Sequence, residues 1–158
     1  MKAVCKTLLQ ATAIIALATA LSLGVNTLRP DGLPLVEARP SAVQLDQGSG
    51  EISIKDAAML FASGRAVFLD ARSQFEFEQG HIKGAVNLPP REFASQFQDI
   101  KPRLMGKEVI ITYCDGERCP LSHALAEHLR GAGLKNVRVL KNGWTLWSTE
   151  KLPVEQGR

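Results

Sequence analysis

Cysteine is scarce in this chain: only three of its 158 residues are cysteine. Three cysteines are too few for a scaffold held by disulfides, and Cys5 lies in an N-terminal segment outside any expected folded domain. A structural zinc ion usually takes four Cys or His ligands, but His123 and His128 are five apart on a predicted helix and do not share a face with each other. Cys114 and Cys119 thus have no further pair of ligands beside them. The sequence therefore predicts no disulfide scaffold, no metal site and no cofactor.

An excess of one charge is also lacking in the part of the chain that we expect to fold. The formal net charge of +3 is carried by Lys2, Lys6 and Arg29, and the remaining chain has 16 basic and 16 acidic residues. Phosphate binding needs a concentrated basic face, so the composition argues against nucleic acid as a partner. Hydrophobic residues make up 45% of the chain, which is enough for the packed core of one domain.

A charge-free and largely apolar run extends from Thr7 to Asn26, behind two lysines. A membrane-spanning helix needs about 20 apolar residues, whereas the apolar part of a signal peptide has about 7–15. We therefore expect residues 1–28 to form an uncleaved single-pass anchor, with a cleaved signal as the alternative. The positive-inside rule keeps the lysines in the cytoplasm. The rest of the chain would then face the bacterial periplasm from the inner membrane, or would be secreted into the periplasm after cleavage.

The rest of the chain divides into a linker and one domain. Residues 29–50 are rich in Pro, Gly and small polar residues, as linkers are. Residues 51–158 alternate helix and strand patterns. We expect strands over residues 66–70, 84–89, 108–114 and 137–140, and helices that begin near Ser53, Ser73, Arg91, Pro120 and Gly143. This alternation predicts an α/β fold with a mostly parallel central sheet and helices on both faces.

Cys114 ends the strand predicted over residues 108–114, and a short loop leads from it to the next helix. Ligand sites of open α/β sheets lie at the carboxyl ends of the strands. Gly116 can adopt backbone angles that other residues avoid, and the loop amides and the helix N-terminus can favour a bound anion. A thiol held there is favoured as the reactive thiolate. From location alone, Cys114 is either such a nucleophile or simply a buried cysteine at a strand end.

Three segments resemble, in order, a single rhodanese (sulfurtransferase) domain. The first, FLDARSQFEFEQGHIKGAVNLP (residues 68–89), is similar to the family's Asp-x-Arg strand end followed by Gly-His-Ile-x-Gly-Ala. The second, ITYCDGERCPLSHALAEHLRGAG (111–133), resembles its active-site strand, loop and helix. The third, VRVLKNGWTLWSTEKLPV (137–154), resembles its closing strand, Gly-Trp pair and final helix. The resemblance covers the predicted domain and implies the rhodanese fold and sulfur-transfer activity.

The resemblance also implies roles for single residues. Cys114 matches the catalytic cysteine, which would accept a sulfane sulfur as a persulfide and pass it to a thiophilic acceptor. The rest of its loop is then implied as the substrate-binding site: Asp115, Gly116, Glu117, Arg118 and Cys119. Asp70 and Arg72 match the Asp-x-Arg motif, and we expect them to support the loop through hydrogen bonds. The implied partners are a small sulfur donor and a small acceptor, with the membrane contacted by the N-terminal helix.

The loop leaves the donor and the role of Cys119 open. The acidic Asp115 and Glu117 would repel a dianion, so a persulfide, polysulfide or protein donor fits better than thiosulfate. Cys119 is a spectator, a thiol that resolves the Cys114 persulfide, or a structural disulfide partner. Two other functions also stay open: a non-catalytic binding or sulfur-carrying module, and a thiol–disulfide redox protein that uses both cysteines.

Overall fold

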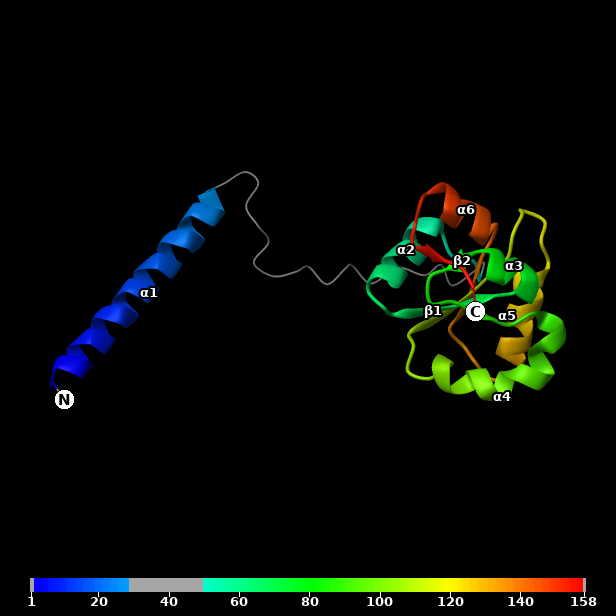
Figure 1. Cartoon of the computed structure of the whole chain (residues 1–158), viewed down its shortest axis with the longest axis horizontal. Coiled ribbons are helices and arrows are strands. Elements are labelled where there is room, and N and C mark those ends of the chain that lie inside the picture. Colours follow the sequence, from blue (N-terminus) through cyan, green and yellow to red (C-terminus); the bar gives the residue numbers. More distant parts are fainter. Residues whose placement is uncertain (1, 29–49, 158) are drawn as a thin grey trace. The chain divides into compact units, whose positions relative to one another are not determined.

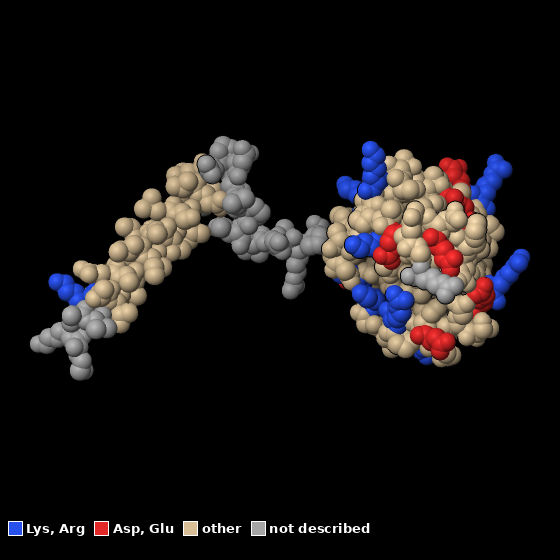
Figure 2. Space-filling view, in the orientation of Figure 1, with Lys and Arg blue, Asp and Glu red and all other residues tan. Residues whose placement is uncertain are grey.

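A computed structural model describes residues 2–28 and 50–157, so nearly all of the linker predicted over residues 29–50 lies outside the described residues. Helix α1 (Lys2–Leu28) forms a unit of its own, separate from the domain. Its segment Lys6–Asn26 has a mean hydropathy of 2.0 and is long and apolar enough to cross a membrane. Figure 2 shows an almost uncharged surface along α1. The predicted N-terminal helix is therefore confirmed as a candidate membrane span or signal segment.

The domain alternates helices and strands as predicted (Figure 1). Its elements are α2 (Ile54–Ala62), β1 (Ala66–Asp70), α3 (Gln74–Gln79), β2 (His81–Ile82), β3 (Val86–Asn87), a 3₁₀ turn η1 (Pro90–Glu92), α4 (Phe93–Leu104), β4 (Val109–Tyr113), α5 (Leu121–Gly131), β5 (Val137–Leu140), α6 (Gly143–Thr149) and β6 (Val154–Glu155). Strands β3, β1, β4 and β5 form a parallel sheet in that order. The predicted α/β fold is confirmed.

Local hydrogen bonds explain where several helices begin. The Ser53 side chain accepts a hydrogen bond from the Asp56 amide (3.1 Å) at the start of α2. Ser73 and Glu76 form a capping box at the start of α3, in which each side chain binds the backbone amide of the other residue. Both of these helix starts were predicted. Helix α5 begins one residue after Pro120, which is its N-cap and does not lie in its first turn.

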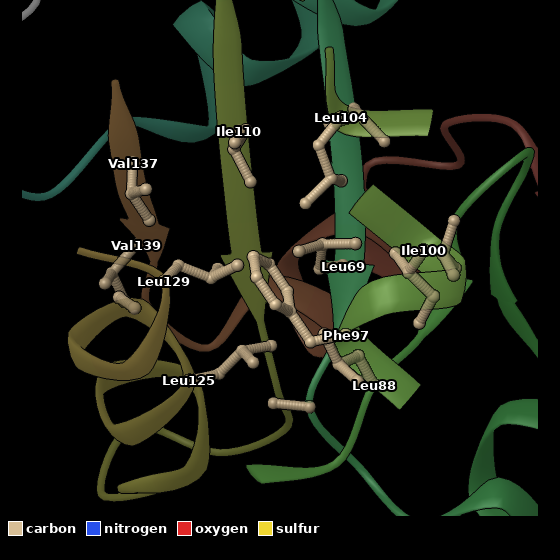
Figure 3. Packing of buried hydrophobic residues seen from close by; sticks show 14 of the residues in the cluster. Leu69, Leu88, Phe97, Ile100, Leu104, Ile110, Leu125, Leu129, Val137 and Val139 are labelled. Carbon is tan, nitrogen blue, oxygen red and sulfur yellow. The ribbon is translucent and has the colours of Figure 1, made fainter. Parts of the chain in front are cut away.

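Helices α4 and α5 cover one face of the sheet. The buried cluster on this face joins Leu69 of β1 and Ile110 of β4 to Phe97 of α4 and to Leu125 and Leu129 of α5. Figure 3 shows these side chains packed between the strands and the two helices. Burial of these apolar side chains is the main force that holds α4 and α5 on the sheet.

Helices α2 and α6 cover the opposite face. Phe68 and Ile111, which are the sequence neighbours of Leu69 and Ile110, belong to a second buried cluster with Leu60 of α2 and Trp147 of α6. Successive strand residues point to opposite faces, so inner strands covered on both sides read as continuous apolar runs. The prediction that helices cover both faces is confirmed.

The short antiparallel pair of β2 and β6 was not predicted, because two residues are too few to show a periodic pattern. His81 donates a hydrogen bond through Nδ1 to the Phe77 carbonyl (2.8 Å), and its Nε2 lies 3.1 Å from Glu155 Oε1. The Gly84 amide donates to the same carboxylate oxygen (2.8 Å). The hydrogen bond from Gly84 and then the contact with His81 hold the pKa of the Glu155 carboxyl below its usual value. These contacts hold the end of the chain against the domain.

A glycine permits the close approach of α6 to the sheet. A Cβ added at Gly143 would lie 2.7 Å from Tyr113 Cβ and 3.1 Å from Leu140 Cγ. We expect Gly143→Ala to lower the free energy of unfolding by about 1–3 kcal/mol, because the added methyl group overpacks the strands. Gly131→Ala, in α5, is the matched control: its added Cβ meets no atom within 4 Å, and helix propensity favours alanine. Urea denaturation measures both variants, and equal losses of stability would contradict the packing argument.

Candidate functional site

The candidate site lies where the parallel strands end. Cys114 directly follows β4, and the loop of residues 114–119 leads to Leu121, the first residue of α5. Cys114 is only 1% exposed and shares a buried cluster with Ala71, which follows β1, and Leu88, which follows β3. Residues that follow three neighbouring strands therefore belong to one buried cluster with this cysteine.

The two domain cysteines are joined to each other. Cys114 and Cys119 form a disulfide, with Cα atoms 6.5 Å apart and a sequence separation of 5. This Cα distance is within the usual range for disulfides. Cys119 is half-buried, whereas Cys114 is buried. Of the three roles that the sequence left open for Cys119, the spectator role is the one that this bond disfavours.

The N-terminal part of α6 holds the loop in place. The Gly116 amide donates hydrogen bonds to Asn142 Oδ1 (2.9 Å) and to Asp115 Oδ1 (2.9 Å), and the Thr145 hydroxyl donates to the same Asp115 oxygen. The Trp144 amide donates to the Cys114 carbonyl (3.1 Å). Gly116 has a φ of 81°, a left-handed conformation that favours glycine. The loop is thus anchored through its backbone and through one carboxylate.

Sequence reasoning missed Asn142 and Thr145 as part of this site. They lie more than twenty residues beyond the loop, and the topology alone brings them to it. One local signal was present: Asn142 immediately precedes the Gly143-Trp144 pair and has a φ of 51°. Asparagine is one of the few residues besides glycine that adopt this conformation readily.

The loop residues predicted to bind substrate fall into two groups. Asp115 and Gly116 are engaged in the anchor, and the Cys119 amide donates to the Gly116 carbonyl (3.3 Å). Two of the amides expected to cradle an anion are therefore occupied in the disulfide-bonded loop. Glu117 and Arg118 are exposed, and within residues 2–28 and 50–157 their side chains form no hydrogen bond or ion pair. Their roles in binding stay predictions.

Asp70 and Arg72 form a buried ion pair beside the loop. Arg72 donates to Asp70 Oδ2 (2.6 Å) and to the Gly80 carbonyl (2.8 Å). Burial disfavours the charged guanidinium, but the hydrogen bond and charge of Asp70 outweigh it, so the pKa of Arg72 is raised. The guanidinium lies 4.6 Å from the centre of the Trp144 ring. The hydrogen bonds of Asp70 and Arg72 do not reach the loop directly. Arg72 is linked to the loop through Trp144, whose amide donates to the Cys114 carbonyl.

A cavity of about 340 Å³ opens at the segments that follow the strands. Its lining residues follow β1 and β3 or begin α5: Ala71, Ser73, Gln74, Glu76, Pro89, Pro90, Arg91, Glu92 and Leu121. The cavity is adjacent to the site, because Ala71 packs in the same cluster as Cys114 and Leu121 begins the helix that follows its loop. One arginine and two glutamates give it mixed charge, which suits a small polar or zwitterionic molecule.

The family model of the rhodanese-like domain matches residues 53–150 of the chain. The chain belongs to the rhodanese family. The resemblance that the sequence motifs carried is therefore confirmed, and the site described above occupies the carboxyl edge of a rhodanese domain.

The proteins that are similar to this chain differ in length. An HTH-type transcriptional regulator of Mycobacterium tuberculosis is 33% identical over 112 residues, which cover 70% of this chain and 47% of the regulator. The chain thus spans about half the length of that relative. The human thiosulfate:glutathione sulfurtransferase is 29% identical over 108 residues, which cover 61% of this chain and 94% of that protein. A crystal structure of a Bacillus halodurans protein matches with a TM-score of 0.59 and 28% identity, over 67% of this chain and 76% of that one.

The contribution of the buried Asp70–Arg72 ion pair to the stability of the rhodanese domain can be measured. We expect Arg72→Met to lower the free energy of unfolding by about 3–5 kcal/mol, because the Asp70 carboxylate stays buried without its partner. Arg65→Met is the matched control, since it removes an exposed ion pair with Glu108, and we expect a much smaller effect. Urea denaturation followed by circular dichroism compares them. If the two substitutions lower the free energy of unfolding by similar amounts, the buried pair stabilises the domain no more than the exposed pair does.

Proposed function

We propose that this rhodanese-family chain is a sulfurtransferase that moves a sulfane sulfur to a thiophilic acceptor through a persulfide on Cys114. The observation that carries the proposal is the position of Cys114. It follows β4 at the carboxyl edge of a parallel sheet, it is held by an anchored loop, and a cavity lined by both apolar and charged residues is adjacent to the site. Family membership supports general sulfur-transfer chemistry at this position.

The proposed reaction has two displacement steps. The Cys114 thiolate attacks the outer sulfur of the donor, and the bond between the two donor sulfurs breaks. Its electron pair leaves with the donor remainder, as a thiolate from a persulfide or as sulfite from thiosulfate. The acceptor thiolate then attacks the outer sulfur of the Cys114 persulfide, and Cys114 leaves as a thiolate. Once the Cys114–Cys119 disulfide is reduced, the sulfane sulfur changes carriers without a further oxidant or reductant.

The charges near Cys114 favour some donors over others. Glu117 and Arg118 are both exposed on the loop, and in the neighbouring cavity Arg91 is accompanied by Glu76 and Glu92. A thiosulfate dianion meets acidic groups on both surfaces, whereas a zwitterionic thiol persulfide can pair with both signs. One human relative is named for thiosulfate and glutathione, and we carry over the low-molecular-weight thiol as the class of donor or acceptor.

We further propose that α1 is retained as a single-pass anchor with the domain on the periplasmic side. Its apolar segment of 21 residues, Lys6–Asn26, has a length of about 31 Å as a helix and matches the hydrocarbon core of about 30 Å. Lys2 and Lys6 at its N-terminal end favour a cytoplasmic N-terminus. The mass of the N-terminal peptide from membrane-extracted protein decides the point. A chain that begins after the apolar segment would establish a cleaved signal.

The sulfur-transfer proposal is tested with the reduced full-length chain in detergent. We expect a Cys119→Ser variant to gain about one sulfur atom per chain from glutathione persulfide, to gain less from thiosulfate, and to lose it to cyanide. Adding Cys114→Ser should abolish the gain, whereas adding Cys5→Ser, the matched control in α1, should leave it unchanged. Intact mass spectrometry measures each state. No gain from either donor would contradict the proposal and favour a binding module or a thiol–disulfide redox protein.

A further inference from the structure

The disulfide involves the very sulfur that the proposed function needs as its nucleophile. We propose that Cys119 is a resolving thiol, which attacks the Cys114 persulfide, releases hydrogen sulfide and leaves the disulfide seen in the structure. The protein would then reduce sulfane sulfur to sulfide, with a dithiol as the reductant that restores both cysteines. This inference rests on the proposed persulfide at Cys114, and it adds an activity that needs no external sulfur acceptor.

The loop brings the two cysteines together by its local geometry. The left-handed Gly116 turns the chain back, and the Cys119 amide closes this turn with a hydrogen bond to the Gly116 carbonyl (3.3 Å). The Cα atoms of Cys114 and Cys119 are 6.5 Å apart while Asn142 and Thr145 still hold the loop. Cys119 therefore reaches the Cys114 sulfur without displacement of β4 or of the anchor on α6.

The atom that Cys119 reaches determines the product. Cys119 contacts the inner sulfur of a Cys114 persulfide, because this is the atom to which it is bonded in the structure. Attack by the Cys119 thiolate forms the new sulfur–sulfur bond and breaks the bond to the outer sulfur. The outer sulfur leaves with the electron pair as hydrosulfide and takes up a proton from solvent. The sulfane sulfur gains two electrons and is reduced to sulfide. The two cysteine sulfurs supply these electrons and are oxidised to the disulfide.

The unequal exposure of the two cysteines favours regeneration of the nucleophile. Cys114 is 1% exposed and Cys119 is half-buried, so an incoming dithiol reaches the Cys119 sulfur first. Its attack there expels Cys114 as a thiolate, and its second thiol then frees Cys119. The dithiol ends as a disulfide, and both cysteines return to the reduced state.

A buried hydroxyl is placed to stabilise the departing Cys114 thiolate. Ser122 is 1% exposed, and its Oγ lies 3.3 Å from Cys114 Sγ. A disulfide sulfur carries no hydrogen, so the hydroxyl is the donor of this contact. The Thr112 hydroxyl donates to the Ser122 carbonyl (2.9 Å) and holds this turn of α5 against β4. A hydrogen bond to the charged form of a group favours that form, so Ser122 helps Cys114 to leave.

A purely structural disulfide fits these observations less well. The stabilisation of a fold by a disulfide grows with the length of the loop that it closes, and this one joins residues only 5 apart. The loop is already held by a hydrogen bond to Asn142 and by hydrogen bonds from Trp144 and Thr145. The bond also consumes the thiol that the family chemistry requires. A reversible disulfide reconciles the two cysteines with that chemistry.

The test follows sulfide release from the full-length chain in detergent. The reduced chain is loaded with glutathione persulfide, passed rapidly through a desalting column and left without any added thiol. We expect wild type to release about one sulfide per chain and to end with Cys114 linked to Cys119 in peptide mass mapping. Dithiothreitol supplied together with excess persulfide should make the release continue over many turnovers.

Substitutions separate this inference from the proposed function. We expect Cys119→Ser and Cys119→Ala to keep the loaded sulfur and to release sulfide at least about tenfold more slowly, whereas the Cys5→Ser control behaves as wild type. Wild type that keeps its persulfide as long as the Cys119 variants overturns the inference. If the Cys119 variants gain no sulfur at all, the proposed function itself fails. Circular dichroism of each variant verifies that it is folded.

Discussion

The common end of the parallel strands is the constraint on which the site depends. Their register pairs Asp70 of β1 with Asn87 of β3 and with Tyr113 of β4, and it pairs Tyr113 with Leu140 of β5. All four strands therefore stop at one level, and the segments that follow them begin at one edge. A slip of one residue would turn every side chain of a strand to the other face, so the two buried clusters hold this register firmly.

The loop at this edge is held by hydrogen bonds at its base and is exposed at its rim. A chain of contacts runs from the buried Asp70–Arg72 pair through the Trp144 ring to the carbonyl of Cys114. On the rim, the Glu117 and Arg118 side chains are exposed, and the surface of the domain seen in Figure 2 carries both signs of charge. The buried sulfur of Cys114 therefore lies beneath exposed and charged loop residues.

The burial of Cys114 affects which reagents can reach its sulfur. A sulfur that is 1% exposed is protected from oxidants and from stray thiols, while a neighbour five residues away is half-buried and open to exchange. The buried hydroxyl of Ser122 supplies a local donor where water is excluded. Transfer to an external thiol and internal resolution by Cys119 would therefore begin from the same persulfide and differ in which sulfur is attacked.

The sequence by itself determined the elements whose signals lie within a few residues. The strands at 66–70 and 137–140 follow from short apolar runs, and the helix starts at Ser53 and Ser73 follow from caps that close within one turn. The β-branched and aromatic run over residues 108–114 also placed Cys114 at the end of its strand, within one residue of where β4 stops. Only the tertiary structure decided that β6 pairs with β2, that Asn142 and Thr145 hold the Cys114 loop, and that the Arg72 guanidinium reaches that loop through Trp144. These contacts join residues far apart in sequence, so they depend on strand order and on how closely α6 packs against the sheet, and no local pattern encodes them.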